Sequence, residues 1–201
     1  MASTMTLRMG KGTCLALAIL LSAPLALADE ITETIDEALK QYNEGNMVDA
    51  AGNLDYAAQL IRQKRGGDLQ SLLPEPLPGW TAEEASSQAT GAAGFGGMVT
   101  AERAYAKGDA SVTITIVADS PMLQGMMMMF SNPMLATADG GKLQKINGQR
   151  AIVKFDDGEP SGEVTVAVAG RFLVTVKGEG LARQELVDYA GAIDFAKLEK
   201  F

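Results

Sequence analysis

The spacing of the apolar residues changes along this chain, and the change restricts the fold more than any other feature does. Within residues 31–65 apolar side chains recur every three or four positions, as on one face of an α-helix. From Gly79 onward they alternate with polar residues, as in a half-buried β-strand. We therefore expect an α+β protein in which a helical hairpin precedes a mainly antiparallel sheet of about seven strands covered by two helices.

The helical part predicts two helices, Ile31–Asn43 and Met47–Lys64. Between them lies Glu44-Gly45-Asn46, in which Gly45 can adopt the left-handed conformation that ends a helix. A turn this short joins antiparallel helices, so residues 29–66 are predicted to form a helical hairpin.

The hairpin also resembles a single tetratricopeptide repeat. The small, aromatic and glycine positions of that pattern are matched by Ala38, Tyr42, Gly45, Ala50 and Ala57. The match covers about one repeat, whereas a stable array needs about three. The resemblance implies protein–protein contact, and the alternative is an ordinary hairpin that docks on the following domain.

Residues 67–78 are predicted to form a linker, because Pro74, Pro76 and Pro78 favour an extended chain. Trp80, the only tryptophan, is expected to anchor this linker on the core of a domain spanning 79–201. The strands predicted in that domain are Trp80–Ser86, Met98–Tyr105, Ser111–Ile116, Gly141–Ile146, Arg150–Phe155, Val164–Val168 and Phe172–Val176. The helices predicted there are Pro121–Phe130 and Ala182–Ala196.

The motif Leu77-Pro78-Gly79-Trp80 and the order of elements over about residues 77–198 resemble the PsbP/Mog1-type α-β-α sandwich. The sequence is also similar to an uncharacterised family of proteobacterial exported proteins. These resemblances imply a binding or assembly role in a periplasm. They supply no catalytic residue.

Residues 1–28 have the organisation of a secretory signal peptide. Arg8 and Lys11 precede the apolar run Leu15–Leu27, and Ala26-Leu27-Ala28 is a small-x-small cleavage pattern. An uncleaved anchor is the alternative, but the run is shorter than the roughly 20 residues of a membrane-spanning helix. We expect cleavage after Ala28, a periplasmic mature protein and no stable membrane insertion.

Composition excludes several kinds of chemistry. The signal peptide holds two of the 17 basic side chains and none of the 25 acidic ones, which leaves a mature net charge of −10 and argues against nucleic acid as a partner. There is no histidine, and the only cysteine is Cys14 in the signal peptide. Triads that use histidine or cysteine, and zinc sites that use histidine, are therefore excluded, and we expect no cofactor.

A methionine-rich segment lies in the predicted helix Pro121–Phe130. On a helix Met122, Met126 and Met129 share a face, and their thioethers could bind Cu(I). The alternative is that these side chains pack in the core or form an apolar contact surface. The candidates for a partner-binding surface are Tyr42, Leu54, Trp80, Met126 and Met127.

The sequence as a whole favours an exported, non-enzymatic binding or assembly module with an unknown periplasmic protein partner. One alternative is a periplasmic Cu(I)-binding protein that uses the methionine-rich helix. The other is a hydrolase that works through carboxylate, tyrosine or lysine side chains.

Overall fold

The computed structural model describes residues 26–89, 98–120, 123–132, 134, 137, 140–156 and 158–201, with side chains at all of these except 26–29, 124, 129 and 131. It confirms an α+β fold with a mainly antiparallel sheet. The helices are α1 (Ala26–Asn43), α2 (Met47–Gln70), α3 (Leu123–Ser131), α5 (Arg183–Gly191) and α6 (Phe195–Lys200). The strands are β1 (Thr81–Ala82), β2 (Ser86–Ala89), β3 (Val99–Lys107), β4 (Ala110–Ala118), β5 (Lys142–Ile146), β6 (Gln149–Asp156), β7 (Ser161–Val168) and β8 (Phe172–Glu179).

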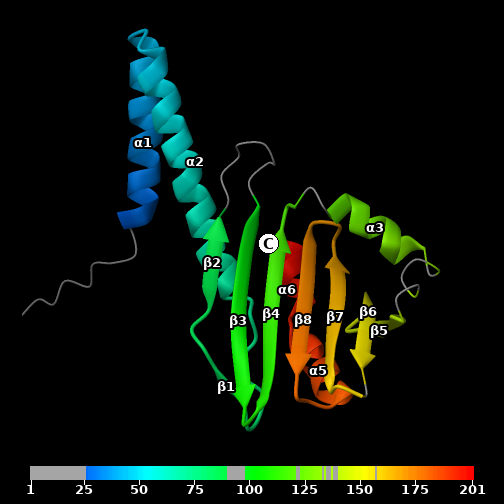
Figure 1. The fold of residues 1–201 in the computed structure, drawn as a ribbon. Helices are drawn as coiled ribbons and strands as arrows, with labels where there is room; N and C mark the ends of the chain where they lie inside the picture. The colour runs from blue at the N-terminus through cyan, green and yellow to red at the C-terminus, as the bar shows by residue number, and fades with distance from the viewer. Residues whose placement is uncertain are drawn as a thin grey trace, which may run out of the picture.

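The sheet consists of two meanders that meet at its centre. Strands β1 and β2 pair with different ends of β3, which pairs with β4, and β5 to β8 pair in chain order. The two meanders join where β4 pairs with β8, and every pair is antiparallel. Figure 1 shows the hairpin of α1 and α2 projecting from one end of this sheet.

The two faces of the sheet differ in what covers them. Alternate residues of the strands, such as Ile114, Val174 and Val164, face a core that is closed by α5, α6 and the C-terminal end of α2. In Figure 1 α5 and α6 lie behind the sheet. On the other face α3 packs through Phe130 on Ile152 at one end, and we call the remainder of this face the polar sheet face.

Helix α2 continues to Gln70, six residues beyond its predicted end, so part of the predicted linker 67–78 is helical. The predicted boundary between the hairpin 29–66 and the linker 67–78 lies at Gly66-Gly67, but Gly66 is buried where α2 passes close to β2. A Cβ atom at Gly66 would lie 2.8 Å from Ser87 Oγ. The glycine therefore permits contact between the helix and the sheet and does not end the helix.

Two other predicted elements are divided in the structure. The predicted helix Ala182–Ala196 forms α5 and α6, because Asp194 caps a new helix by accepting a hydrogen bond from the Lys197 backbone N–H at 3.1 Å. The predicted strand Trp80–Ser86 forms β1 and the start of β2, which brings the sheet to eight strands.

Candidate functional site

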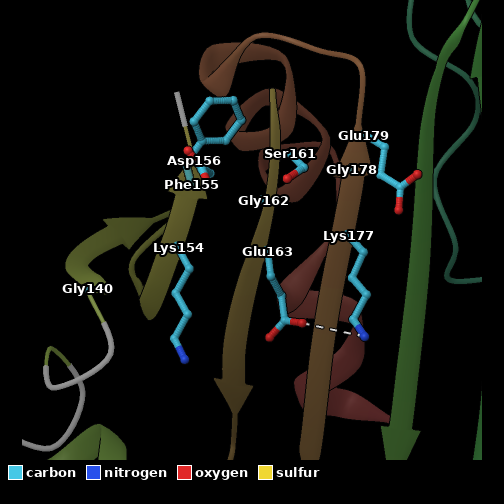
Figure 2. Close-up of a pocket in the computed structure, with 10 residues that line it drawn as sticks. All are labelled: Gly140, Lys154, Phe155, Asp156, Ser161, Gly162, Glu163, Lys177, Gly178 and Glu179. Atoms are coloured by element: carbon cyan, nitrogen blue, oxygen red, sulfur yellow. Dashed lines mark ion pairs between the residues drawn. The ribbon is translucent and has the colours of Figure 1, made fainter. Parts of the chain in front are cut away.

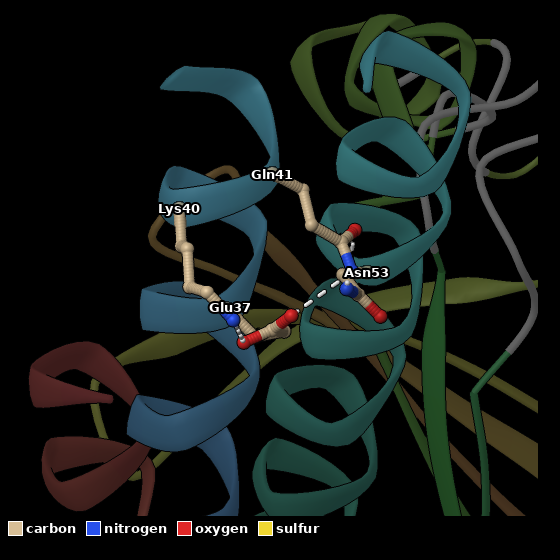
Figure 3. A network of polar contacts seen from close by, with 4 residues as sticks. All are labelled: Glu37, Lys40, Gln41 and Asn53. Atoms are coloured by element: carbon tan, nitrogen blue, oxygen red, sulfur yellow. Dashed lines mark hydrogen bonds and ion pairs between the residues drawn. The ribbon is translucent and has the colours of Figure 1, made fainter. Parts of the chain in front are cut away.

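Helices α1 and α2 are held together on one side by a polar network. Gln41 Nε2 donates to Glu37 Oε1 at 3.0 Å, and Asn53 Nδ2 of α2 donates to Gln41 Oε1 at 3.1 Å. Lys40 Nζ lies 3.4 Å from Glu37 Oε2. Figure 3 shows these side chains grouped on one side of the two helices, with strands of the sheet behind them.

Large apolar side chains lie on the opposite side of the hairpin. Helical periodicity places them beside the line along which α1 and α2 meet, on the side away from the polar network. Among the described residues twelve large apolar side chains are exposed; eight of these lie on the hairpin, and five of the eight belong to this side. We use the term open hairpin face for Ile35, Leu39 and Tyr42 of α1 together with Leu54, Ala58 and Ile61 of α2.

This face continues the side of α2 that packs on the sheet. Leu54, Ala58 and Ile61 are followed at helical spacing by Arg65 and Leu69. Leu69 is 0% exposed and belongs to the core, whereas Leu54 is 54% exposed. The apolar stripe of α2 therefore begins beyond the end of the sheet and ends inside the core.

A charged cluster fixes α2 where it reaches the sheet. Arg65 Nη2 lies 2.8 Å from Asp119 Oδ2, and Arg171 Nε lies 3.2 Å from Asp119 Oδ1. Partial burial alone would raise the pKa of Asp119, but the hydrogen bonds and charges of the two arginines outweigh it and lower this pKa below its ordinary value. The guanidinium of Arg65 also lies over the Phe201 ring, 5.6 Å from its centre.

This cluster was not predicted from the sequence. Asp119 is 54 residues from Arg65 and 52 from Arg171, so no local spacing connects them. A weak signal in the sequence is that Asp119 directly follows a run of alternating residues. In the structure this run is β4, which ends at Ala118, and Asp119 has a backbone φ of 55°.

The exposed part of the hairpin is acidic. Residues 30–61 contain seven acidic side chains and one basic side chain, Lys40, and all eight are exposed. Three basic residues follow at the base: Arg62, Lys64 and Arg65. The open hairpin face contains no charged residue itself. It is an apolar surface surrounded by the acidic side chains of the same two helices.

The candidate surface residues are not brought together into one surface. Tyr42 and Leu54 lie on the open hairpin face and are 58% and 54% exposed. The inclusion of Trp80 was wrong, because Trp80 is 7% exposed and packs edge to face on Tyr189 with ring centres 5.0 Å apart. It anchors the linker instead. Met126 is half-buried and Met127 is exposed, both on α3.

The proposed copper ligands cannot be placed as a set. Met122 and the side chain of Met129 lie outside the described residues, and Met126 is half-buried. Within the described ranges no group of three or more carboxylate, histidine or cysteine side chains is placed to hold a metal ion.

A shallow groove of about 540 Å³ lies at the polar sheet face, and Figure 2 shows the side chains that line it. Lys177 Nζ lies 3.6 Å from Glu163 Oε2 across the β7–β8 pair, and Thr165 Oγ1 donates to Glu163 Oε1 at 3.1 Å. Lys154 extends from β6 on the same side. The central carboxylate of this groove is therefore held by its neighbours.

Most of the predicted signal peptide, residues 1–25, lies outside the described residues. Helix α1 begins at Ala26, so the predicted cleavage position after Ala28 falls in its first turn. Of the helices in the described part of the chain, none is both long enough and apolar enough to span a membrane.

A scan against models of known protein families found no match, and searches of curated proteins and of solved structures found no significant match. The resemblances to a tetratricopeptide repeat, to the PsbP/Mog1-type sandwich and to exported proteobacterial proteins therefore stay predictions.

Proposed function

We propose that this protein is an exported, non-enzymatic binding or assembly module, and that the open hairpin face binds a helical segment of another protein. The observation that carries the proposal is the exposure of Leu39, Tyr42 and Leu54 on one side of a projecting hairpin. Monomeric proteins seldom expose a contiguous apolar surface of this kind, and such surfaces mark interaction sites.

The way the hairpin is mounted supports the same role. The polar network fixes α1 against α2, and the Arg65–Asp119–Arg171 cluster fixes α2 against the sheet. A preorganised surface loses less conformational entropy when a partner binds. The sheet then serves as the base from which the hairpin projects.

Export is part of the proposal and is supported by residues 1–28. Cleavage after Ala28 would leave Asp29 as the first residue of the mature chain, within the first turn of α1. The bond from Tyr56 Oη to Glu30 Oε1, 3.0 Å long, would remain in the mature chain.

A hydrolase is less well supported. The tyrosine with the largest pKa shift, Tyr105, has its pKa raised to about 12, mainly by burial, and its hydroxyl donates to the Pro74 carbonyl at 2.7 Å. This group lies in the core under the linker and not in the groove of the polar sheet face. Burial in the core therefore accounts for the raised pKa of Tyr105, and this shift does not indicate a catalytic group.

The proposal is tested by comparing two double variants of the full chain. Leu39→Gln with Leu54→Gln alters the open hairpin face, and Met127→Gln with Met128→Gln alters the exposed side of α3 as a matched control. Each protein is used to capture partners from an extract of its own cells, and the captured protein is identified, purified and titrated by calorimetry.

We expect the hairpin variant to lose at least tenfold in affinity for the purified partner, because exposed apolar anchors at an interface centre contribute most of its affinity. The α3 variant should bind as the wild type does. Unchanged binding by the hairpin variant, or loss only in the α3 variant, would refute the assignment of the hairpin.

A further inference from the structure

Resting on the proposed function, we infer that the partner segment is a basic amphipathic helix that lies along the open hairpin face between α1 and α2. The partner helix would carry an apolar stripe that packs on the open hairpin face, and lysine or arginine side chains on both flanks of that stripe. The charges around the face, its size and its position above the sheet lead to this inference.

Both edges of the open hairpin face carry a carboxylate. Asp36 follows Ile35, and Asp55 follows Leu54, so each lies about 100° further around its helix, at the outer edge of the face. Both side chains are exposed. A helix seated between α1 and α2 would therefore have an acidic residue on either flank.

The wider field has the same sign. Residues 30–61 carry a net charge of −6, and Lys40, their one cation, is within 3.4 Å of Glu37. Electrostatic complementarity of this kind selects a basic partner and speeds its association. An acidic or neutral helix would gain no such attraction.

The size of the face fits one helix. Each helix contributes about eight residues to this face, Ile35–Tyr42 of α1 and Leu54–Ile61 of α2, which at 1.5 Å per residue is about 12 Å, or about two turns of a bound helix. Two antiparallel helices present a groove along their line of contact, and a third helix packs there through residues spaced three and four apart.

A second copy of this chain fits less well. Two hairpins would bring two regions of net charge −6 together, and the whole chain has a net charge of −8. The sheet also lies on the same side of α2 as the open hairpin face, since Leu69 continues the stripe into the core. A second hairpin with its own sheet therefore has less room here than a single helix.

The test uses two synthetic helices of 18 residues and the full-length protein. The first contains leucine on one face and lysine elsewhere, and the second is identical except that glutamate replaces lysine. Binding is measured by fluorescence anisotropy of labelled peptide, and induced helicity by circular dichroism. We expect the lysine peptide to bind at least tenfold more tightly than the glutamate peptide.

Two variants separate charge from apolar contact. Asp36→Asn with Asp55→Asn should weaken binding of the lysine peptide roughly three- to tenfold and reduce its salt dependence. Leu39→Gln with Leu54→Gln, which keeps every charge, should weaken it at least tenfold. Equal binding by the leucine variant would show that the peptide is attracted by charge alone and would overturn the inference.

The remaining outcomes are also decisive. Equal or tighter binding of the glutamate peptide, or no binding of either peptide, would overturn the inference of a basic helix but would leave the proposed function standing if partner capture still depended on Leu39 and Leu54. A wild-type dimer in sedimentation velocity that dissociates in the leucine variant would identify a second copy as the occupant. Capture that is independent of the hairpin would refute the proposed function itself.

Discussion

The two halves of α2 have the same apolar spacing and different surroundings. In the C-terminal half Gly66 and Leu69 are buried against the sheet, and in the N-terminal half Met47 and Leu54 are exposed. The difference shows that a helical stripe reports which side of a helix is apolar, but not what covers it. Within this chain the sheet covers only the lower half of the stripe, and the upper half is available to a partner.

The strongest way to test this contrast is to truncate one leucine in each half. Leu69→Ala should lower the free energy of unfolding by about 2–5 kcal/mol, because Leu69 is 0% exposed and its removal leaves a cavity. Leu54→Ala, the matched control, should change it by less than about 0.5 kcal/mol. Urea unfolding of both variants is the measurement, and similar losses would contradict the difference between the two halves.

A second pair of variants places the same residue at two glycines of α2. A side chain at Gly66 would meet Ser87, so Gly66→Leu should destabilise the protein by about 1–3 kcal/mol. A Cβ atom added at Gly52 would have nothing within 4 Å of it, and Gly52→Leu should stabilise the protein by roughly 0.5–1 kcal/mol through helix propensity. Thermal unfolding gives the signs, and two shifts of equal sign would contradict this explanation.

The cluster at the junction of the two halves predicts a pH dependence. The pKa of Asp119 is lowered in the folded protein, so its carboxylate stabilises the fold above the unfolded pKa of about 3.9. This contribution is lost as the pH falls through the lower, folded pKa. Asp119→Asn should therefore lower the free energy of unfolding by about 1 kcal/mol at pH 7.

The same variant should differ less from the wild type as the pH is lowered, and should match it below the folded pKa of Asp119. The measurement is urea unfolding of both proteins over a series of pH values. A difference that is constant with pH would show that the ion pairs with Arg65 and Arg171 are not its cause. Lys40→Ala, which removes an exposed pair with Glu37, is a suitable control.

The smallest effect is expected on the polar side of the hairpin. Tyr56→Phe removes the hydrogen bond to the Glu30 carboxylate but keeps the ring. Because both side chains are exposed, we expect no measurable change in the free energy of unfolding. A clear loss by urea unfolding would contradict the small contribution expected of an exposed hydrogen bond on this side of the hairpin.

Much of the fold could be predicted from the sequence, because alternating and helical spacings are local. The strands around Ile114, Val166 and Val174 and the two helices of the hairpin follow from them. The continuation of α2 through Gly66 could not be predicted, because it depends on a close contact with Ser87 of a strand that follows. The break before α6 depends on Asp194, whose capping role was hidden by the apolar stripe on either side of it.

The candidate site could be predicted only in part. Tyr42 and Leu54 were identified by their positions on apolar stripes, and Trp80 as the only tryptophan, which the core buries. Sequence patterns do not distinguish these cases, because burial is decided by elements far away in the chain. The pairing of Arg65 and Arg171 with Asp119 could not be predicted for the same reason, because the three residues are more than 50 positions apart in sequence.

The junction between the two meanders has a consequence for how the chain folds. Each meander is built from neighbouring segments, but the junction pairs Ala118 with Phe172 and Ser111 with Glu179. Contacts so distant in sequence form slowly, because a long loop must close before they contribute energy. We therefore expect the meanders to form first and to expose the edges of β4 and β8 until they meet. During that interval a newly made chain is most susceptible to pairing with another chain at those edges.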